Sequence, residues 1–312
     1  MGLGDFDLFF SRSRNHANLM QHLDHSHFLV PAGKKIKLED YPCDATHGIA
    51  NKATAEADLD TDRKALSEAQ SVLWASAKYS VMIILQAMDA AGKDGTIKHV
   101  MSGMNPQGVE VHSFKAPNSE EVLRPFLHRP LRVMPQRGRI ALFNRSYYEE
   151  VLVVRVHPEY LEPQCLPEEQ MKNGIDHLWQ HRYDEINTME QWWTNNNMLV
   201  LKFFLNVSRE EQKERFLERI DDPEKHWKFN SGDIRERGLW NEYQRAYEQM
   251  LSATSTKHAP WYVIPADKKW YARAAVADII IKRINELKLE YPKISAAEKA
   301  KLAESRASLM AE

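Results

Sequence analysis

The sequence predicts an α/β fold in which a five-stranded parallel sheet is covered by helices on both faces. Short apolar runs of β-like composition alternate with helical segments, and this alternation is typical of parallel sheets. Polar residues follow every run, at the edge of the sheet where proteins of this class bind ligands. The predicted strands are Ser80–Gln86, Val109–Phe114, Arg139–Asn144, Met198–Val207 and Trp261–Ala266.

Helical segments can be assigned around these strands in chain order. Residues 54–79 precede the first strand, and Leu59, Leu66 and Leu73 recur there at helical spacing. After the fourth strand, a serine at 208 and a glutamate three residues later have the spacing of a capping box, so a helix is expected to begin there.

The C-terminal third contains an exposed excursion and further helices. The excursion, residues 221–237, is dense in charge and contains a proline and two aromatic residues. Helices are predicted at about 238–252 and 269–289, on either side of the fifth strand. The tail 295–312 begins with a second capping box and is charged on all sides, so we expect a peripheral helix that is a candidate for a subunit contact.

Composition excludes several classes of protein. The 312 residues are enough for one large domain with additions or for two small domains. The formal net charge of -2 gives no basic signature, so a nucleic-acid partner is not expected. Cys43 and Cys165, the only cysteines, suggest no disulfide framework, which favours a reducing, cytoplasmic location. Without a signal-peptide pattern or an apolar run of membrane-spanning length, no membrane partner is expected.

The segment AMDAAGKDGT, residues 87–96, has the layout of a P-loop between a strand and a helix. The backbone N–H groups of such a loop surround phosphate oxygens, and its lysine, here Lys93, neutralises their charge. Ala87 occupies a position where glycine is usual, and an aspartate replaces the usual magnesium-binding serine or threonine. The expected phosphate-binding residues of the loop are Ala91, Gly92, Asp94, Gly95 and Thr96.

Two carboxylates, Asp89 and Asp94, lie within this anion-binding loop and would repel phosphate. A divalent cation between carboxylate and phosphate removes the conflict, and Mg²⁺ is the oxygen-seeking choice. We therefore expect a magnesium site that includes Asp89, with Mn²⁺ as an alternative ion. The competing interpretation is a turn of small residues that binds no ligand.

A second motif, GRIALFNRSYYEE at residues 138–150, contains the third predicted strand. The strand delivers Asn144 and Arg145 to its carboxyl end, beside the P-loop if the two strands are neighbours. Many P-loop enzymes have a magnesium-binding aspartate at this place. The amide oxygen of Asn144 can still coordinate a metal, directly or through water.

Histidines near the N-terminus provide a weaker candidate site. Imidazole is a common metal ligand, but no cysteine or carboxylate cluster completes a ligand set. We therefore expect residues 1–53 to form a surface arm. The histidines are His16, His22, His25 and His27.

Several segments together resemble the pattern of the family-2 polyphosphate kinases. The resemblance covers roughly residues 35–290 and is far more specific than the P-loop alone. The segments are AMDAAGKDGTIKHV, MNPQGVEVHSFKAP, RGRIALFNRSYYEEVLVVRVHP, FLERIDDPEKHWKF and APWYVIPADKKW.

The resemblance implies a three-layer α/β/α P-loop kinase fold, similar to that of thymidylate kinase, with a helical lid. Residues 54–290 would form the kinase domain, with the lid at about 215–240, and residues 291–312 a peripheral helix. The implied reaction is a reversible, Mg²⁺-dependent phosphoryl transfer between inorganic polyphosphate and a nucleotide. The third segment is similar to the subgroup that accepts AMP as well as ADP, in which Asn144 and Glu149 are associated with that breadth. The family also implies homo-oligomers, as dimers or tetramers.

Phosphoryl transfer needs aligned phosphates and well-placed positive charge. We expect Asp89 to hold the metal and orient the acceptor phosphate, Lys93 to bridge the two phosphates, and Arg145 to stabilise the transferring group. The remaining cations exceed what a mononucleotide requires, and a long polyanion would account for them. They are Lys98, Lys115, Arg129, Arg132, Arg215 and Arg219.

The lid is expected to cover the nucleotide and to exclude water when it closes. Lys225, Trp227 and Lys228 are the candidates for this contact. Asn144 and Glu149 are expected to help place the metal and the nucleotide. Arg215 and Arg219 are expected to close over the site from the side of the lid. The alternative is that the two lysines are ordinary surface residues and that these arginines form a solvated helix face.

Two other functions stay open on the sequence alone. The first is a nucleotide or nucleoside kinase with ATP as donor, against which the aspartate at position 94 argues. The second is a P-loop protein that binds phosphate or polyphosphate without turnover, against which the intact Asp89, Lys93 and Arg145 argue. Substitution of Asp89 by alanine separates them, because an enzyme would lose nearly all its rate and a passive binder would keep most of its affinity.

Overall fold

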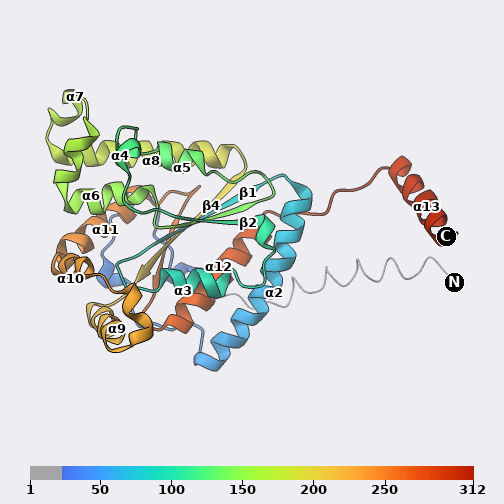
Figure 1. Ribbon diagram of the computed structural model, residues 1–312, viewed down its shortest axis with the longest axis horizontal. Helices are drawn as coiled ribbons and strands as arrows, with labels where there is room; N and C mark the ends of the chain where they lie inside the picture. Colours follow the sequence, from blue (N-terminus) through green and yellow to red (C-terminus); the bar gives the residue numbers. More distant parts are fainter. Residues whose placement is uncertain (1–22) are drawn as a thin grey trace.

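A computed structural model describes residues 23–312. Its centre is a sheet of five parallel strands in the order β2-β3-β1-β4-β5 (Figure 1). The prediction of a five-stranded parallel sheet is confirmed, and no strand end differs from its prediction by more than one residue. The strands are β1 (Ser80–Gln86), β2 (Val109–Ser113), β3 (Ile140–Asn144), β4 (Met198–Asn206) and β5 (Trp261–Pro265).

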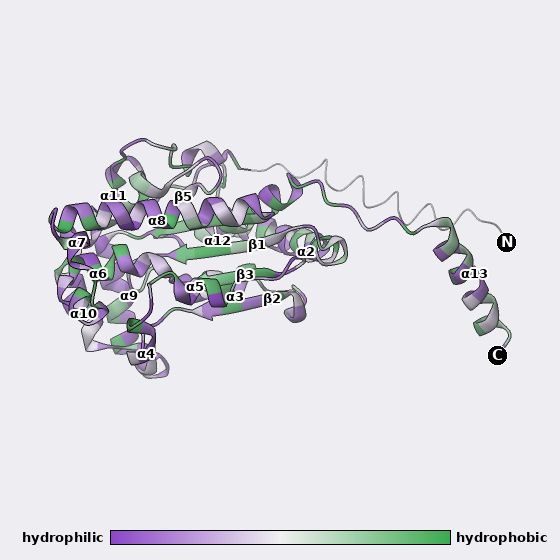
Figure 2. Cartoon of the chain, turned by 90° about the horizontal axis from the view of Figure 1, so that it is seen from above, coloured by the Kyte–Doolittle hydropathy of each residue, from purple (hydrophilic) through white to green (hydrophobic). Residues whose placement is uncertain are grey.

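The central strand β1 is buried along its whole length. Val81 pairs with Ile140 of β3 on one side and with Leu199 of β4 on the other. A strand with no solvent-facing side is apolar throughout rather than alternating, which is why the periodicity of its sequence is featureless. Figure 2 shows this contrast, because β1 is hydrophobic whereas the edge strand β2 carries Glu110 and His112 and is hydrophilic.

Helices cover both faces of the sheet and complete a three-layer α/β/α arrangement (Figure 1). On one face α12 packs against α2 and α3, and on the other α8 packs against β4 and α11. The predicted fold class is therefore confirmed. The main helices are α2 (Lys52–Ser76), α3 (Lys93–Val100), α8 (Ile175–Asn195), α11 (Trp240–Thr254) and α12 (Lys269–Asn285).

α12 is buried on most of its sides, between β5 and α2. Ala272, Ala275 and other small residues let these elements approach closely. Its first turns begin directly after β5, so they reach the carboxyl edge of the sheet and bring Lys269 and Arg273 there.

Residues 23–51 pack onto the domain, although the sequence favoured a surface arm over residues 1–53. Phe28 and Val30 are buried. The N–H of Val30 donates to the carbonyl of Trp261, and the N–H of Val263 donates to the carbonyl of Phe28. These bonds occupy the free edge of β5, which would otherwise expose unpaired backbone groups. The described part of the expected arm thus belongs to the folded core.

The histidines at the N-terminus do not gather around a metal in the described chain. His25 contacts Asp278 at 2.7 Å, and the rings of His27 and His47 stack with 4.3 Å between their centres. Within residues 23–312, no three potential ligand side chains form a metal-binding group. His16 and His22 lie outside the described residues.

The excursion between β4 and α11 is mostly helical rather than irregular. It contains α9 (Arg209–Asp221), η6 (Pro223–Lys228) and α10 (Ser231–Gly238), and these occupy the residues expected to form a lid. The side chain of Ser208 accepts a hydrogen bond from the N–H of Glu211, so the predicted N-cap of α9 is confirmed.

The C-terminal helix α13 (Ala296–Met310) stands away from the other elements in Figures 1 and 2. All of its residues are exposed, and Ser295 and Glu298 form both halves of the predicted capping box.

No helix within residues 23–312 is long and apolar enough to cross a membrane.

Short helical turns make up the remaining connections between the elements described above. The turns are η1 (His25–His27), η2 (Leu38–Asp40), η3 (Pro106–Gly108), α4 (Ser119–Val122), α5 (His128–Arg132), η4 (Tyr147–Val151), α6 (Val153–Val156), η5 (Pro158–Gln164) and α7 (Glu168–Met171).

Candidate active site

A cavity of about 1110 Å³ lies at the carboxyl edge of the sheet. Its walls come from the loop after β1, the ends of β2 and β3, the short elements α4, α6 and η5, the lid elements α9, η6 and α10, and the first turns of α12. Parallel strands all end at this edge, so residues distant in sequence meet there. The predicted site residues all line the cavity except Lys98 and Arg132.

Helix geometry explains why Lys98 and Arg132 are not at the cavity. Lys98 follows Lys93 by five residues, which rotates it by roughly 140° around α3, and its side chain is exposed. Arg132 is exposed in the last turn of α5, whereas Arg129, one turn earlier, lies over the ring of Phe114 and lines the cavity. The structure does not support the two predicted phosphate contacts of Lys98 and Arg132.

The loop after β1 has the backbone of an anion-binding turn. Gly92 has a φ of 109°, which residues with a Cβ rarely adopt, and Ala90 has a φ of 61°. α3 begins at Lys93, and no side chain caps it. The first N–H groups of a helix have no partner within the helix, so this end of α3 can donate to a ligand.

Lys93 is buried at the centre of this loop. Its Nζ donates to the carbonyls of Ala87 and Met88 at 2.8 and 3.3 Å. Burial, reinforced by the charge of Arg145, lowers the pKa of Lys93 to about 8. An anion beside the lysine would oppose both effects and favour its charged form.

Asp89 and Arg145 face each other across the ends of β1 and β3. The guanidinium of Arg145 forms ion pairs with Asp89 and, at 3.2 Å, with Glu149. Arg145 has a φ of 60°, yet its N–H still donates to the carbonyl of Leu85 at 3.0 Å and continues the strand pairing. Asp89 and Glu149 thus hold the guanidinium from two sides, and Glu149 is itself fixed by a hydrogen bond of 3.0 Å from the amide of Gln86. Glu149 and Asp89 together raise the pKa of Arg145, which stays charged.

Asn144 lies next to the second loop carboxylate. Its amide nitrogen donates to Asp94 at 2.8 Å. The end of β3 therefore contacts the first turn of α3, as expected for strands that are neighbours in the sheet. This contact leaves the amide oxygen of Asn144 available to another ligand.

Arg215 is part of the scaffold of the loop rather than a free phosphate ligand. Its side chain is only 4% exposed. The guanidinium donates to the carbonyls of Ala90 and Ala91 in the loop and of Ala266 and Asp267 after β5. All its donor groups are thus engaged with protein oxygens in this structure, and the predicted phosphate contact of Arg215 stays a prediction.

The lid residues line the cavity with fewer contacts. Arg219 pairs with Asp233 of α10 at 3.6 Å, and Lys225 pairs with Asp222 at 3.0 Å. Trp227 is 78% exposed and touches Lys228 in a cation–π contact of 4.9 Å. These side chains border the site but are not fixed by packing.

The sequence did not predict some of the residues at or beside the site. Gln212 is buried and donates to the carbonyl of Asp89 at 2.9 Å, while Arg237 of α10 donates to the Gln212 side chain at 2.7 Å. Lys269 and Arg273 reach the cavity from α12. They lack a local motif, although their spacing of four residues could have indicated a shared helix face.

A buried polar cluster lies behind the motif that carries Arg145. Tyr147 and Tyr148 both donate to one carboxylate oxygen of Glu190 at 2.7 Å. Lys202 of β4 donates to the other oxygen of Glu190 at 2.6 Å, to Tyr148 and to the carbonyl of Thr254. The cluster anchors η4, which follows Arg145 and contains Glu149.

Comparisons with known proteins agree with this geometry. A family model described as "Polyphosphate kinase 2" matches residues 49–292. The chain is 44% identical to an ADP-polyphosphate phosphotransferase of Rhodopseudomonas palustris, over 91% of this chain and 97% of that protein. It is 41% identical to an AMP/ADP-polyphosphate phosphotransferase of Meiothermus ruber, over 86% and 96% of the two chains. The crystal structure of polyphosphate kinase 2 from Arthrobacter aurescens aligns with a TM-score of 0.79 and 38% identity, covering 88% of this chain and 95% of that one.

Proposed function

Because the chain belongs to the polyphosphate kinase 2 family, we propose that it is a polyphosphate-dependent nucleotide kinase, which transfers phosphoryl groups reversibly between inorganic polyphosphate and adenine nucleotides. The observation that carries this proposal is the meeting of Asp89, Lys93 and Arg145 at a phosphate-binding loop inside one large cavity. Transfer of a phosphoryl group depends on such positioning and charge.

The metal in this proposal is Mg²⁺, with Mn²⁺ as the alternative. The donor set fits, because Asp89, Asp94 and the amide oxygen of Asn144 all border the phosphate cavity. Mg²⁺ takes few protein ligands and completes its shell with phosphate oxygens and water. Asp89 would hold the ion, which when bound neutralises charge on the reacting phosphates.

The protein's own groups bind and orient the phosphates. Lys93 can turn its N–H donors from the carbonyls of Ala87 and Met88 to phosphate oxygens entering the loop. Arg145 is held in a fixed direction by two carboxylates, so it meets developing charge without first being ordered. Closure of the lid over the cavity would exclude water.

The nucleoside belongs at the end of the cavity formed by α4, α6 and η5. This end combines apolar side chains with polar ones such as Glu121 and Gln164, whereas the loop is lined mainly by polar groups. Ligand sites commonly hold a base in such an apolar part. Lys225, Trp227 and Lys228 would cover the nucleotide from the lid. The apolar residues are Val122, Phe126, Val153, Val154 and Pro163.

Acceptance of both AMP and ADP is the finer part of the proposal. It is supported by the presence at the cavity of Asn144 and Glu149, the two positions associated with that breadth in the subgroup that the third segment resembles. The Meiothermus ruber relative has both nucleotides in its name.

The test is a transfer assay with long-chain polyphosphate and Mg²⁺, in which AMP and ADP are offered separately. We expect ADP from AMP and ATP from ADP. Formation of ATP from ADP, without ADP from AMP, would contradict the broad acceptor range. It would still agree with a polyphosphate-dependent kinase. Transfer only with ATP as donor would contradict polyphosphate dependence, and tight polyphosphate binding without any product would indicate a passive binder.

A homo-oligomer, as a dimer or tetramer, is also part of the proposal. α13 exposes Leu302, Leu309 and Met310 by 60, 68 and 73%, and none of its residues is buried by the described part of the chain. A second copy of the chain would remove these side chains from water.

A further inference from the structure

Arg273 is exceptional among the arginines that line the cavity. It is half-buried on α12, and within residues 23–312 it makes no hydrogen bond or ion pair. Each of the other arginines at the cavity has a carboxylate or carbonyl partner. They are Arg124, Arg129, Arg145, Arg215 and Arg219.

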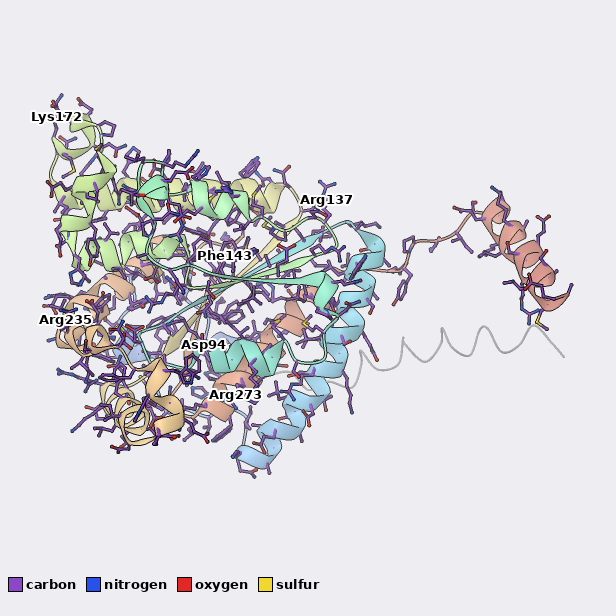
Figure 3. All side chains as sticks on the ribbon, in the orientation of Figure 1. Asp94, Arg137, Phe143, Lys172, Arg235 and Arg273 are labelled. Carbon is purple, nitrogen blue, oxygen red and sulfur yellow. The ribbon has the colours of Figure 1, made fainter. Side chains whose placement is uncertain are left out.

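The Arg273 side chain lies against the first turn of α3. A Cβ placed on Gly95 would be 3.3 Å from Nη2 of Arg273, so the guanidinium approaches the backbone of the phosphate loop closely. Figure 3 shows Arg273 near Asp94, at the end of α3 that faces the cavity. Lys269 lies one turn earlier on α12 and also lines the cavity.

The surroundings of Arg273 are positive and have little to compensate its charge. Burial lowers its pKa, and the charges of Arg63 and Arg215 lower it further, while Glu56 acts in the opposite direction. Arg63 is already bound to the carbonyl of His99 and to Asp60. Because no described side chain or carbonyl accepts from its guanidinium, the donors of Arg273 are available to an anion that enters the cavity.

The end of the cavity beside Arg273 differs chemically from the end between α4, α6 and η5. The lining beside Arg273 consists of Lys269, its ion-pair partner Glu218 of α9 at 3.7 Å, Ala272 and the polar loop, with no large apolar side chain from α12. The opposite end, between α4, α6 and η5, carries the apolar residues. The two ends lie toward opposite helical layers of the fold (Figure 1). An anionic chain without a base fits the first end and a nucleoside the second.

We propose that Arg273, together with Lys269, forms an additional phosphate subsite that binds polyphosphate beyond the phosphates held by the loop. The proposal rests on the proposed function, because it extends the polyphosphate site of that enzyme. A linear polyphosphate with its reacting end at Lys93 would then leave the loop along α12. Arg273 is a binding residue in this arrangement and takes no part in the transfer itself.

The experiment compares Arg273→Gln with the wild-type protein, using ADP and either long-chain polyphosphate or tripolyphosphate as donor. Loss of one charged hydrogen-bonding contact should raise the KM for long-chain polyphosphate about tenfold, with kcat within about twofold. The KM for tripolyphosphate should change less, because a short donor does not reach the subsite, and the KM for ADP should not change. Titration of long-chain polyphosphate without nucleotide should show the same loss of affinity.

Arg245→Gln is the matched control, because it removes the same charge from an exposed site on α11 outside the cavity. Arg273→Lys keeps a charge and should give an intermediate KM, and thermal melting of each variant shows that it is folded. An unchanged KM for long-chain polyphosphate, an equal loss with both donors, or a loss confined to kcat would each overturn the subsite. If the wild-type protein transfers nothing from polyphosphate, the proposed function itself fails, which is a separate result.

Discussion

We expect single side chains at the loop to determine whether the site can transfer a phosphoryl group. Substitution of Asp89 is the most direct test. Asp89→Asn keeps the size of the side chain and removes the charge that would hold the metal. We expect kcat to fall by a factor on the order of 10²–10³, because preorganised charge at the reacting phosphates is lost. Steady-state rates with ADP and polyphosphate measure this. Asp60→Asn, an exposed carboxylate on α2, is the control, and normal activity of Asp89→Asn would exclude the assigned role.

Lys93 gives the site a pH dependence whose direction follows from its burial. Its pKa is lowered to about 8, so the free enzyme loses the charged lysine as pH rises through that value. We expect kcat/KM for polyphosphate to fall above about pH 8, and kcat to fall only at higher pH because bound phosphate restores the charge. In Lys93→Arg the residual activity should lack this limb.

The same pKa has a consequence for stability. Between about pH 8 and the ordinary value of 10.5, the folded protein binds fewer protons at Lys93 than the unfolded chain does. The contribution of this group to the free energy of unfolding therefore rises with pH across that window.

For the kinetic prediction, a flat profile of kcat/KM for polyphosphate from pH 7 to 10 would contradict the role given to the charge of Lys93.

The element η4 is anchored by the buried cluster of Glu190, Lys202, Tyr147 and Tyr148. Lys202 and Glu190 have no exposed surface. Lys202→Met leaves a buried, unpaired carboxylate, so it should lower the free energy of unfolding by about 3–5 kcal/mol. Tyr147→Phe removes one hydrogen bond and should cost about 1 kcal/mol. Urea unfolding measures both changes.

The pair can be removed as a unit to check this explanation. The double variant Lys202→Met/Glu190→Leu should lose less than the sum of the two single variants, because each single variant leaves one buried charge unpaired and the double variant leaves none. Additive losses would show that the two side chains do not act as a pair. Phe143→Leu, within the apolar core of β3, serves as a reference for loss of packing without loss of a polar contact.

Over the whole molecule, the sequence predicted what depends on local pattern and missed what depends on distant contacts. The five strands followed from continuous apolar runs, and the loop between β1 and α3 followed from the spacing of its small residues. The contacts of Arg215 were not predictable, because helix periodicity cannot tell that its guanidinium reaches both the loop and the segment after β5. Likewise the edge pairing of Phe28 and Val30 with β5 joins residues over 200 positions apart, and no local signal records such a contact.

The outermost helix gives a prediction for the assembled protein. α13 is fully exposed and contributes no buried side chain to the domain. Deletion of residues 291–312 should therefore leave the unfolding free energy of the domain nearly unchanged, since little apolar surface is lost from its core. If α13 packs against a second copy, the same deletion should lower the molar mass in light scattering from that of a dimer or tetramer. Leu302→Glu/Leu309→Glu should reproduce this effect in the full-length chain, because a buried unpaired charge opposes association. Lys299→Glu/Lys301→Glu, which changes charge on the same helix without altering its leucines, is the control. An unchanged molar mass in the deletion variant would exclude α13 as a subunit contact.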